Sequence, residues 1–81
     1  MTEAEVYAGL TDVFRDLFGD PALQLRPDTT AADISGWDSF NHLNIVAGAE
    51  ERFGVRLGTR EVEGLRNVGD LAQLILKKRG G

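Results

Sequence analysis

Residues that could do chemistry gather in segment 36–42, which reads GWDSFNH and contains the chain's single histidine. A serine acts as a nucleophile when a general base lies within hydrogen-bond reach and donors stabilise the oxyanion. Ser39 and His42 are three residues apart, a spacing that can place both side chains on one helix face. The glycines do not form the Gly-x-Ser-x-Gly turn of hydrolases, and 81 residues leave little room for a substrate pocket. The sequence therefore disfavours a Ser39–His42 hydrolase.

Two other roles suit Ser39. Serine and aspartate are among the commonest helix N-caps, so Ser39 could simply begin a helix. Alternatively, the free amides and positive dipole end at a helix N-terminus would favour a phosphodiester carried on the serine. Residue pattern alone leaves both roles open.

The elements that must position Ser39 begin with a helix after Thr2. Thr2 and Glu5 fit the reciprocal capping box, and Gly19 followed by Pro21 ends the helix. Its apolar residues recur at helical spacing and form one stripe, comprising Val6, Leu10, Val13, Phe14 and Leu17.

Residues 19–37 form an unusually long connection, and loops of this length are usually functional or disordered. Its apolar residues Leu23, Leu25 and Ile34 predict an ordered loop that packs on the helices. A second helix is expected to begin near Asp38 or Ser39 and to stop at Gly54. Its predicted buried side consists of Phe40, Leu43, Val46, Ala47 and Phe53.

The C-terminal third predicts a short helical segment around residues 59–65, with Val62 and Leu65 facing inward. A last helix follows, capped by Asn67, with a cationic end that suits its dipole. Its stripe comprises Val68, Leu71, Leu74 and Ile75. No run of β-branched residues at every second position is long enough to predict a sheet. The predicted fold class is all-α: a four-helix bundle of three main helices plus one short helix, with a long loop between the first two.

Composition excludes several function classes. The length fits one small domain, and the lack of cysteine excludes thiolate zinc clusters and redox motifs. The N-terminus lacks a basic, apolar leader, and no apolar run could span a membrane, so a cytoplasmic protein without membrane partners is expected. Residues 1–54 carry ten acids against three arginines, whereas residues 55–81 carry six bases against three acids. Because an acidic surface repels nucleic acid and attracts basic protein surfaces, no nucleic-acid partner is expected.

Segment 38–55, DSFNHLNIVAGAEERFGV, resembles the acyl carrier protein family. That family shows Asp-Ser-Leu, a helix with hydrophobic residues at matching spacing, an acidic pair, and then Phe and a β-branched residue. The likeness extends over nearly the whole chain, in the order of an amphipathic helix, a long loop, this helix, a short helix and a closing helix. It implies one acyl carrier domain over residues 1–81 that is not itself an enzyme.

The resemblance also implies a cofactor and partners. Ser39, flanked by Asp38 and Phe40, would receive 4′-phosphopantetheine from coenzyme A through a phosphopantetheinyl transferase. The terminal thiol would then carry acyl groups as thioesters to an acyltransferase, a ketosynthase or other acyl-processing enzymes. A chain without cysteine is consistent with an imported thiol. The carrier is expected to act as a monomer.

Three departures from the family pattern matter. Phe40 replaces the usual Leu, and because both are apolar, modification should be retained. Gly36-Trp37 precedes Asp38, a variant similar to discrete carriers of polyketide and other specialised pathways, so secondary-metabolite biosynthesis is predicted. Asn41, His42 and Asn44 stand where primary fatty-acid carriers are usually acidic, which predicts a specialised set of partners. The predicted partner contacts are Trp37, Asn41, His42 and Glu50.

Alternatives remain at this point. An aminoacyl or peptidyl carrier is possible, although those typically read Gly-Gly-His/Asp-Ser, and a helical interaction module without cofactor is the competing class. Trp37 could serve as half-buried packing or contact the arm or a partner enzyme. His42 could be a solvated surface residue or a contact for the transferase.

Overall fold

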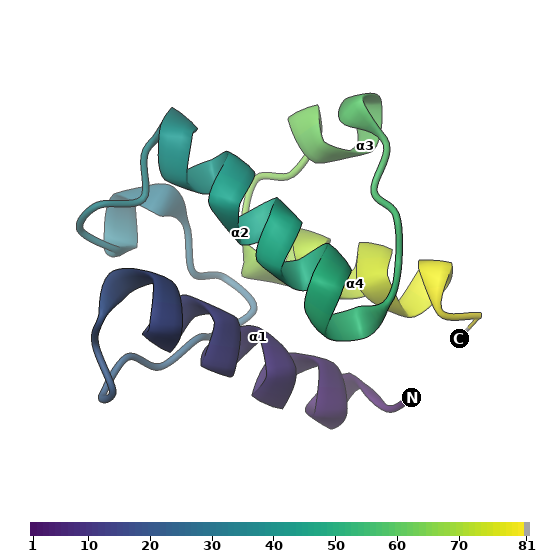
Figure 1. The fold of residues 1–81 in the computed structure, drawn as a ribbon, viewed down its shortest axis with the longest axis horizontal. Coiled ribbons are helices and arrows are strands. Elements are labelled where there is room, and N and C mark those ends of the chain that lie inside the picture. The colour runs from purple at the N-terminus through teal and green to yellow at the C-terminus, as the bar shows by residue number, and fades with distance from the viewer. Residues whose placement is uncertain (81) are drawn as a thin grey trace.

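A computed structural model describes residues 1–80 and contains four α-helices (Figure 1). These are α1 (Glu3–Phe18), α2 (Ser39–Phe53), α3 (Thr59–Glu63) and α4 (Val68–Lys78), with a 3₁₀ turn, η1 (Ala31–Asp33), inside the long loop. Helix α1 packs against both α2 and α4. The short α3 lies in the connection between α2 and α4, at one edge of the bundle. No strand occurs among the described residues. The predicted all-α fold with one short helix is confirmed; the η1 turn was not predicted.

Helix ends lie where the local sequence places them. The Thr2 hydroxyl accepts from the Glu5 amide at 3.2 Å, and the Glu5 carboxylate accepts from the Thr2 amide at 2.8 Å. At the other end of α1, Gly19 adopts a left-handed φ of 62°. The Asn67 side chain caps α4 by accepting from the Asp70 amide at 2.8 Å. These contacts span three residues or fewer, so the sequence specifies them directly.

The long loop is tied to the first turn of α4. The Val68 amide donates to the Thr29 carbonyl and the Gly69 amide to the Pro27 carbonyl, both at 2.9 Å. These amides would otherwise lack partners at a helix N-terminus. A side chain at position 69 would place its Cβ 2.7 Å from the Pro27 carbonyl oxygen, so this docking requires glycine. The loop is therefore ordered, as predicted.

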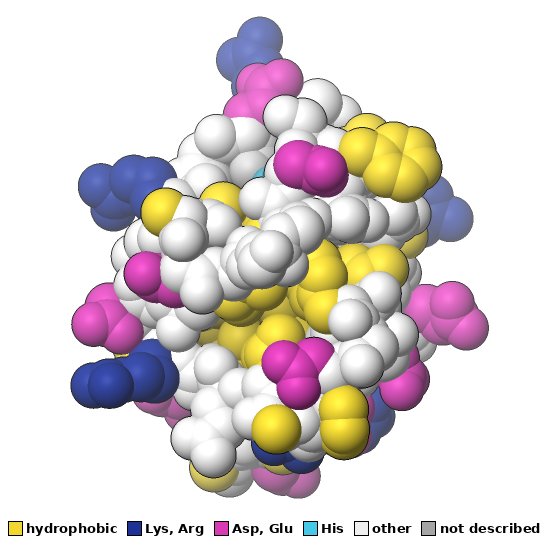
Figure 2. All heavy atoms as spheres, turned by 90° about the vertical axis from the view of Figure 1, so that its left-hand side faces the viewer, with side chains coloured by type: hydrophobic (Ala, Val, Ile, Leu, Met, Phe, Trp, Pro, Cys, Tyr) yellow, Lys and Arg dark blue, Asp and Glu magenta, His cyan; other side chains and the backbone are white. Residues whose placement is uncertain are grey.

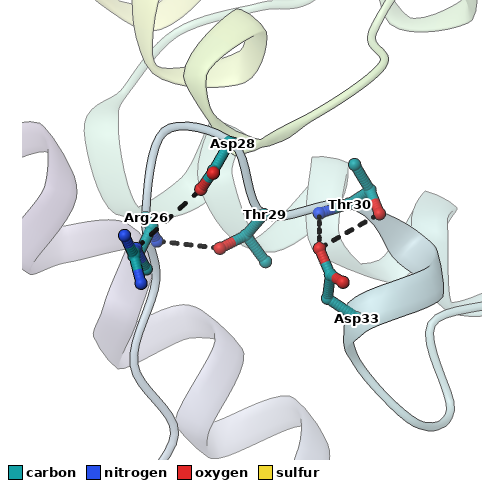
Figure 3. A network of polar contacts seen from close by, with 5 residues as sticks. All are labelled: Arg26, Asp28, Thr29, Thr30 and Asp33. Atoms are coloured by element: carbon teal, nitrogen blue, oxygen red, sulfur yellow. Dashed lines mark hydrogen bonds and ion pairs between the residues drawn. The ribbon is translucent and has the colours of Figure 1, made fainter.

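Polar contacts within the loop set its turns (Figure 3). The buried Thr29 accepts from the Arg26 amide at 2.9 Å through its hydroxyl. Asp33 accepts from both the amide and the hydroxyl of Thr30, which closes the η1 turn. An exposed Arg26–Asp28 ion pair at 3.9 Å adds little, because water screens such pairs. The loop thus reaches Ser39 from a fixed direction.

The core lies between α1, α2 and α4, and the predicted face of α2 is partly wrong. Phe40 is 74% exposed and Leu43 is 64% exposed, and Ala47 is exposed as well. The inward residues of α2 are Ile45, Val46, Ala49 and Phe53. For α1 and α4 the predicted apolar stripes are confirmed by the residues that lie buried in the core, which are Val6, Leu10, Phe14, Val68, Leu71 and Ile75. Leu23, Leu25 and Ile34 of the loop pack against this core, as predicted.

Two aliphatic residues two positions apart on α2 test this orientation. Ile45→Ala is expected to lower the unfolding free energy by about 2–5 kcal/mol, because Ile45 is fully buried. Leu43→Ala is expected to change it by less than about 0.5 kcal/mol, because Leu43 faces outward. Urea unfolding of both variants beside the wild type measures the difference. Equal losses would mean that α2 is rotated about its axis.

Candidate functional site

Ser39 is the first residue of α2, and its neighbour Asp38 fills the capping role. The Asp38 carboxylate accepts from the Asn41 amide at 2.8 Å, and its backbone carbonyl accepts from the His42 amide. Ser39 is exposed, and among residues 1–80 its hydroxyl makes no hydrogen bond. The reading of Ser39 as the helix cap is therefore wrong, since Asp38 performs that function.

The helix start leaves two amides free beside the serine hydroxyl. Within the described chain, neither the Ser39 amide nor the Phe40 amide donates a hydrogen bond. The partial positive charge of a helix N-terminus resides on such amides. An exposed hydroxyl next to free amides is an arrangement that can hold an anionic group.

The turn before Ser39 is fixed by backbone conformation and by Asn41. Gly36 has a φ of 91°, a conformation that glycine adopts without strain. The Asn41 side-chain amide donates to the Gly36 carbonyl at 2.7 Å, which ties the turn to the first turn of the helix. Trp37 follows, and its amide donates to the Ile34 carbonyl at 3.2 Å. Asn41 therefore has a structural role at the predicted site.

Trp37 and His42 contact each other directly. The Trp37 indole N–H donates to Nδ1 of His42 at 3.1 Å, and the two ring planes are inclined by 13°. The edge of Trp37 also meets the buried Phe14 ring, with centroids 5.2 Å apart and planes at 77°. Within residues 1–80, no hydrogen bond joins Ser39 to His42, so the geometry of a serine–histidine nucleophile is absent.

Two hollows meet beside Ser39. One, of about 430 Å³, is lined by Ala31, Trp37, Asp38, Ser39, His42 and Leu65. The next, of about 380 Å³, lies between α2 and α3 and has a mostly apolar lining that includes Leu43, Val46, Leu57 and Val62. His42 and Leu65 line both. A larger hollow of about 760 Å³ lies along α1 near Asp12 and Arg52, away from Ser39, so its size does not make it the site.

The remaining predicted contact, Glu50, lies three turns further along α2. It is half-buried, and its carboxylate accepts from the Leu57 amide at 2.9 Å. Glu50 therefore holds the α2–α3 connection beside the second hollow. Trp37, Asn41 and His42 are brought together at Ser39, whereas Glu50 is not.

Glu61 holds the short helix α3 in place. Its carboxylate accepts from Lys78 on α4 at 2.9 Å and from the Gly58 amide at 2.8 Å. The Lys78 hydrogen bond, followed by that of Gly58, lowers the pKa of Glu61 below its ordinary value of 4.5. Sequence reasoning missed this pair, because the two residues come from separate elements.

This ion pair predicts a pH dependence. A lowered folded-state pKa stabilises the fold above pH 4.5, and this contribution disappears as the pH falls further and Glu61 becomes protonated. The stability difference between wild type and Glu61→Gln should therefore shrink between about pH 5 and pH 3. Urea midpoints at each pH measure it, and Lys78→Gln should flatten the same part of the curve. A constant wild-type advantage across this range would contradict the ion pair.

Among residues 1–80, no helix is both long and apolar enough to cross a membrane. In the same part of the chain, no group of three or more His, Cys, Asp or Glu side chains is arranged to hold a metal ion. The face at the left of Figure 1 shows apolar side chains gathered in a central hollow and at a few places on the rim, with acidic and basic side chains around them (Figure 2).

Comparison with known proteins places this geometry in a family. The family described as "Phosphopantetheine attachment site" matches residues 8–75. An acyl carrier protein from Acidothermus cellulolyticus is 32% identical over 93% of this chain and 89% of its own length. One from Kineococcus radiotolerans is 33% identical over 98% of each chain. The meromycolate extension acyl carrier protein of Mycolicibacterium smegmatis is 29% identical over 94% of this chain and 77% of its own length.

The fold agrees as well. The solution structure of a holo acyl carrier protein from Geobacter metallireducens superposes with a TM-score of 0.84 at 38% sequence identity. The match covers 90% of this chain and 84% of the other. The sequence and the fold together establish that this chain belongs to the acyl carrier protein family, with 4′-phosphopantetheine as its covalently attached cofactor.

Proposed function

We propose that Ser39 carries the phosphopantetheine arm and that the chain delivers acyl thioesters to partner enzymes. One observation carries the assignment: Ser39 is an exposed serine whose hydroxyl is uncommitted and lies beside two free helix amides. A phosphodiester at this position would meet those amides and the positive end of the α2 dipole. The residues present therefore fit the group. When bound, the arm supplies the thiol that this chain lacks.

Two features of α2 suit recognition by partner enzymes. Asp38 keeps its carboxylate at the helix start, next to Ser39. Phe40, Leu43 and Ala47 recur at helical spacing and form an exposed apolar stripe on α2. Aromatic and aliphatic anchors surrounded by polar groups are typical of protein interfaces. We propose that a phosphopantetheinyl transferase and acyl-processing enzymes such as an acyltransferase or a ketosynthase contact this stripe.

Intact-protein mass tests the assignment. The chain is incubated with coenzyme A and a broad-range phosphopantetheinyl transferase that is shown to be active on a control carrier. One arm should be added, and fragmentation should place it on the peptide that contains Ser39. An unchanged mass, with the control modified, would leave the plain helical interaction module as the better account.

For the pathway, we propose a specialised role, in polyketide or related secondary-metabolite biosynthesis. The supporting observation is the sparse charge along α2, whose acids, together with its cap, are Asp38, Glu50 and Glu51. Glu50 is already engaged with the Leu57 amide. The exposed middle of the helix presents Leu43, Asn44 and Ala47 instead. A second candidate, long-chain acyl extension, is favoured by the names of the meromycolate extension relatives.

Charge substitution separates these pathways. Because complementary charge chiefly sets encounter rate and partner choice, Asn44→Glu with Ala47→Glu should raise turnover by a fatty-acid elongation enzyme by about tenfold at low salt. Asn41 is left intact because its side chain holds the Gly36 carbonyl. Asn44→Gln with Ala47→Gln is the neutral control. Wild-type turnover equal to that of a primary fatty-acid carrier would contradict the specialised role.

Several assignments stay predictions. An aminoacyl or peptidyl cargo is the alternative within the carrier class, and loading with acyl and aminoacyl thioesters distinguishes the two. The single domain over residues 1–81, the monomeric state and the cytoplasmic location likewise await measurement.

A further inference from the structure

We propose that Trp37 and His42 form a positioning pair for the arm, in which the indole fixes the imidazole so that Nε2–H of His42 donates to the phosphodiester on Ser39. This inference rests on the proposed attachment at Ser39. It assigns a joint role to two residues that sequence reasoning treated separately. The observations that carry it are the Trp37–His42 hydrogen bond and the hollow that His42 shares with Ser39.

The pair is anchored in the core. Trp37 is half-buried and meets the fully buried Phe14 edge-on at 5.2 Å. Its indole N–H is the donor to His42, so the position of the imidazole is set by packing between α1 and the loop. His42 also belongs to the first turn of α2, where its amide donates to the Asp38 carbonyl at 2.8 Å. Side chain and backbone therefore fix the ring together.

The hydrogen bond also selects a tautomer. Nδ1 accepts from the indole, so the proton of the neutral imidazole resides on Nε2. The two ring nitrogens point in widely different directions, and Nε2 therefore points away from Trp37. A histidine whose one nitrogen is occupied presents the other as an oriented donor, as histidine ligands of metals do.

Among the side chains that line the hollow, His42 is the available donor to a phosphodiester, in addition to the free backbone amides of Ser39 and Phe40. The lining of the hollow is Ala31, Trp37, Asp38, Ser39, His42 and Leu65, which includes no lysine or arginine. The indole N–H is committed to His42, and the Ser39 hydroxyl proton is lost when the arm is attached. Asp38 lines the same hollow, and its negative charge would repel a phosphodiester. A donor from His42, another lining residue, would offset part of that repulsion.

His42 also lies at the junction of the two hollows. With Leu65, it lines both the hollow at Ser39 and the apolar hollow between α2 and α3. A ring held in one orientation gives the start of the arm a defined direction, whereas a freely rotating ring would not. Loss of the pair should therefore free the arm without unfolding the carrier.

Nuclear magnetic resonance tests the pair without an activity assay. The chain has one histidine and one tryptophan, so imidazole ¹⁵N and indole signals need no assignment. At about pH 8.5, the unmodified wild type should show the Nε2–H tautomer. Trp37→Phe keeps a ring against Phe14 but removes the donor, and should give a mixture of tautomers. Adding the arm to the wild type should shift the Nε2 signal.

The ³¹P signal of the modified chain gives the second readout. Trp37→Phe and His42→Leu should move it, by more than its linewidth, toward its position in the urea-unfolded carrier. His42→Gln, which retains an N–H near the Nε2 position, should stay closer to wild type. Glu51→Gln, an exposed change further along the same helix, is the control and should leave the signal in place.

The outcomes separate this inference from the assignment of Ser39. A ³¹P signal that is the same in wild type and His42→Leu, with the arm mapped to Ser39, overturns the positioning pair alone. An unmodified wild type overturns the Ser39 assignment, and the inference falls with it. If His42→Leu fails to fold, two other measurements decide whether the pair positions the arm. These are the shift of the wild-type Nε2 signal on modification and the ³¹P signal of Trp37→Phe.

Discussion

Ser39→Ala is expected to abolish addition of the phosphopantetheine arm, whereas Ser35→Ala is expected to leave it at the wild-type level. These are the two serines of the chain, they are four residues apart, and both are exposed. Accessibility therefore does not distinguish them. Ser39 alone begins a helix of fifteen residues, beside the free amides of its first turn and the Asp38 cap. Ser35 lies in the turn before Gly36, without that environment.

Intact mass after incubation with coenzyme A and the transferase measures the effect, with both variants and wild type treated side by side. Circular dichroism should show unchanged helicity in Ser39→Ala, because Ser39 is exposed and, among residues 1–80, its hydroxyl forms no hydrogen bond. Modification of Ser39→Ala, or its loss in Ser35→Ala, would move the attachment point elsewhere.

Phe14→Ala should have the largest effect on stability, about 3–5 kcal/mol. Phe14 is fully buried and packs against Phe18, at a centroid distance of 5.9 Å, and against Trp37. A small domain can have as little as about 5 kcal/mol in total, so this variant should retain only about 0–2 kcal/mol and unfold at very low urea concentrations. Because Phe14 supports Trp37, the turn before Ser39 should lose its order as well.

Phe40→Ala is the matched control, since it removes the same ring from an exposed position on α2. Its unfolding free energy should stay within about 0.5 kcal/mol of wild type. Urea unfolding followed by circular dichroism compares the three proteins. Similar midpoints for Phe14→Ala and wild type would contradict the core described above.

The sequence determined the features that depend on neighbouring residues. The ends of α1 follow from Thr2, Glu5 and Gly19, whose contacts span a few positions. The start of α4 follows from Asn67 in the same way. The segment around Asp38 and Ser39 identified the candidate site, because a helix start is encoded locally. Resemblance then supplied the family and the cofactor, which the comparisons confirmed.

The inward face of α2 required the tertiary structure. Phe40, Leu43 and Ala47 recur at intervals of three and four residues, and Ile45, Ala49 and Phe53 recur at intervals of four residues. Both series therefore satisfy the helical period, and periodicity cannot say which one faces the core. Packing against α1 and α4 decided which series faces inward, because the side chains of Ile45, Ala49 and Phe53 fit into the core between those helices. The first series was left exposed at the site.

The interior of the site also depended on the fold. Trp37 and His42 flank Ser39 in sequence, but their hydrogen bond forms because Phe14, from a different helix, positions the indole. Likewise, the Glu61–Lys78 pair and the bonds from Val68 and Gly69 to the loop join segments far apart in the chain. Local propensity specifies none of these contacts. The sequence thus determined which serine begins the helix, and tertiary packing decided which side chains surround it, because only packing brings distant segments together.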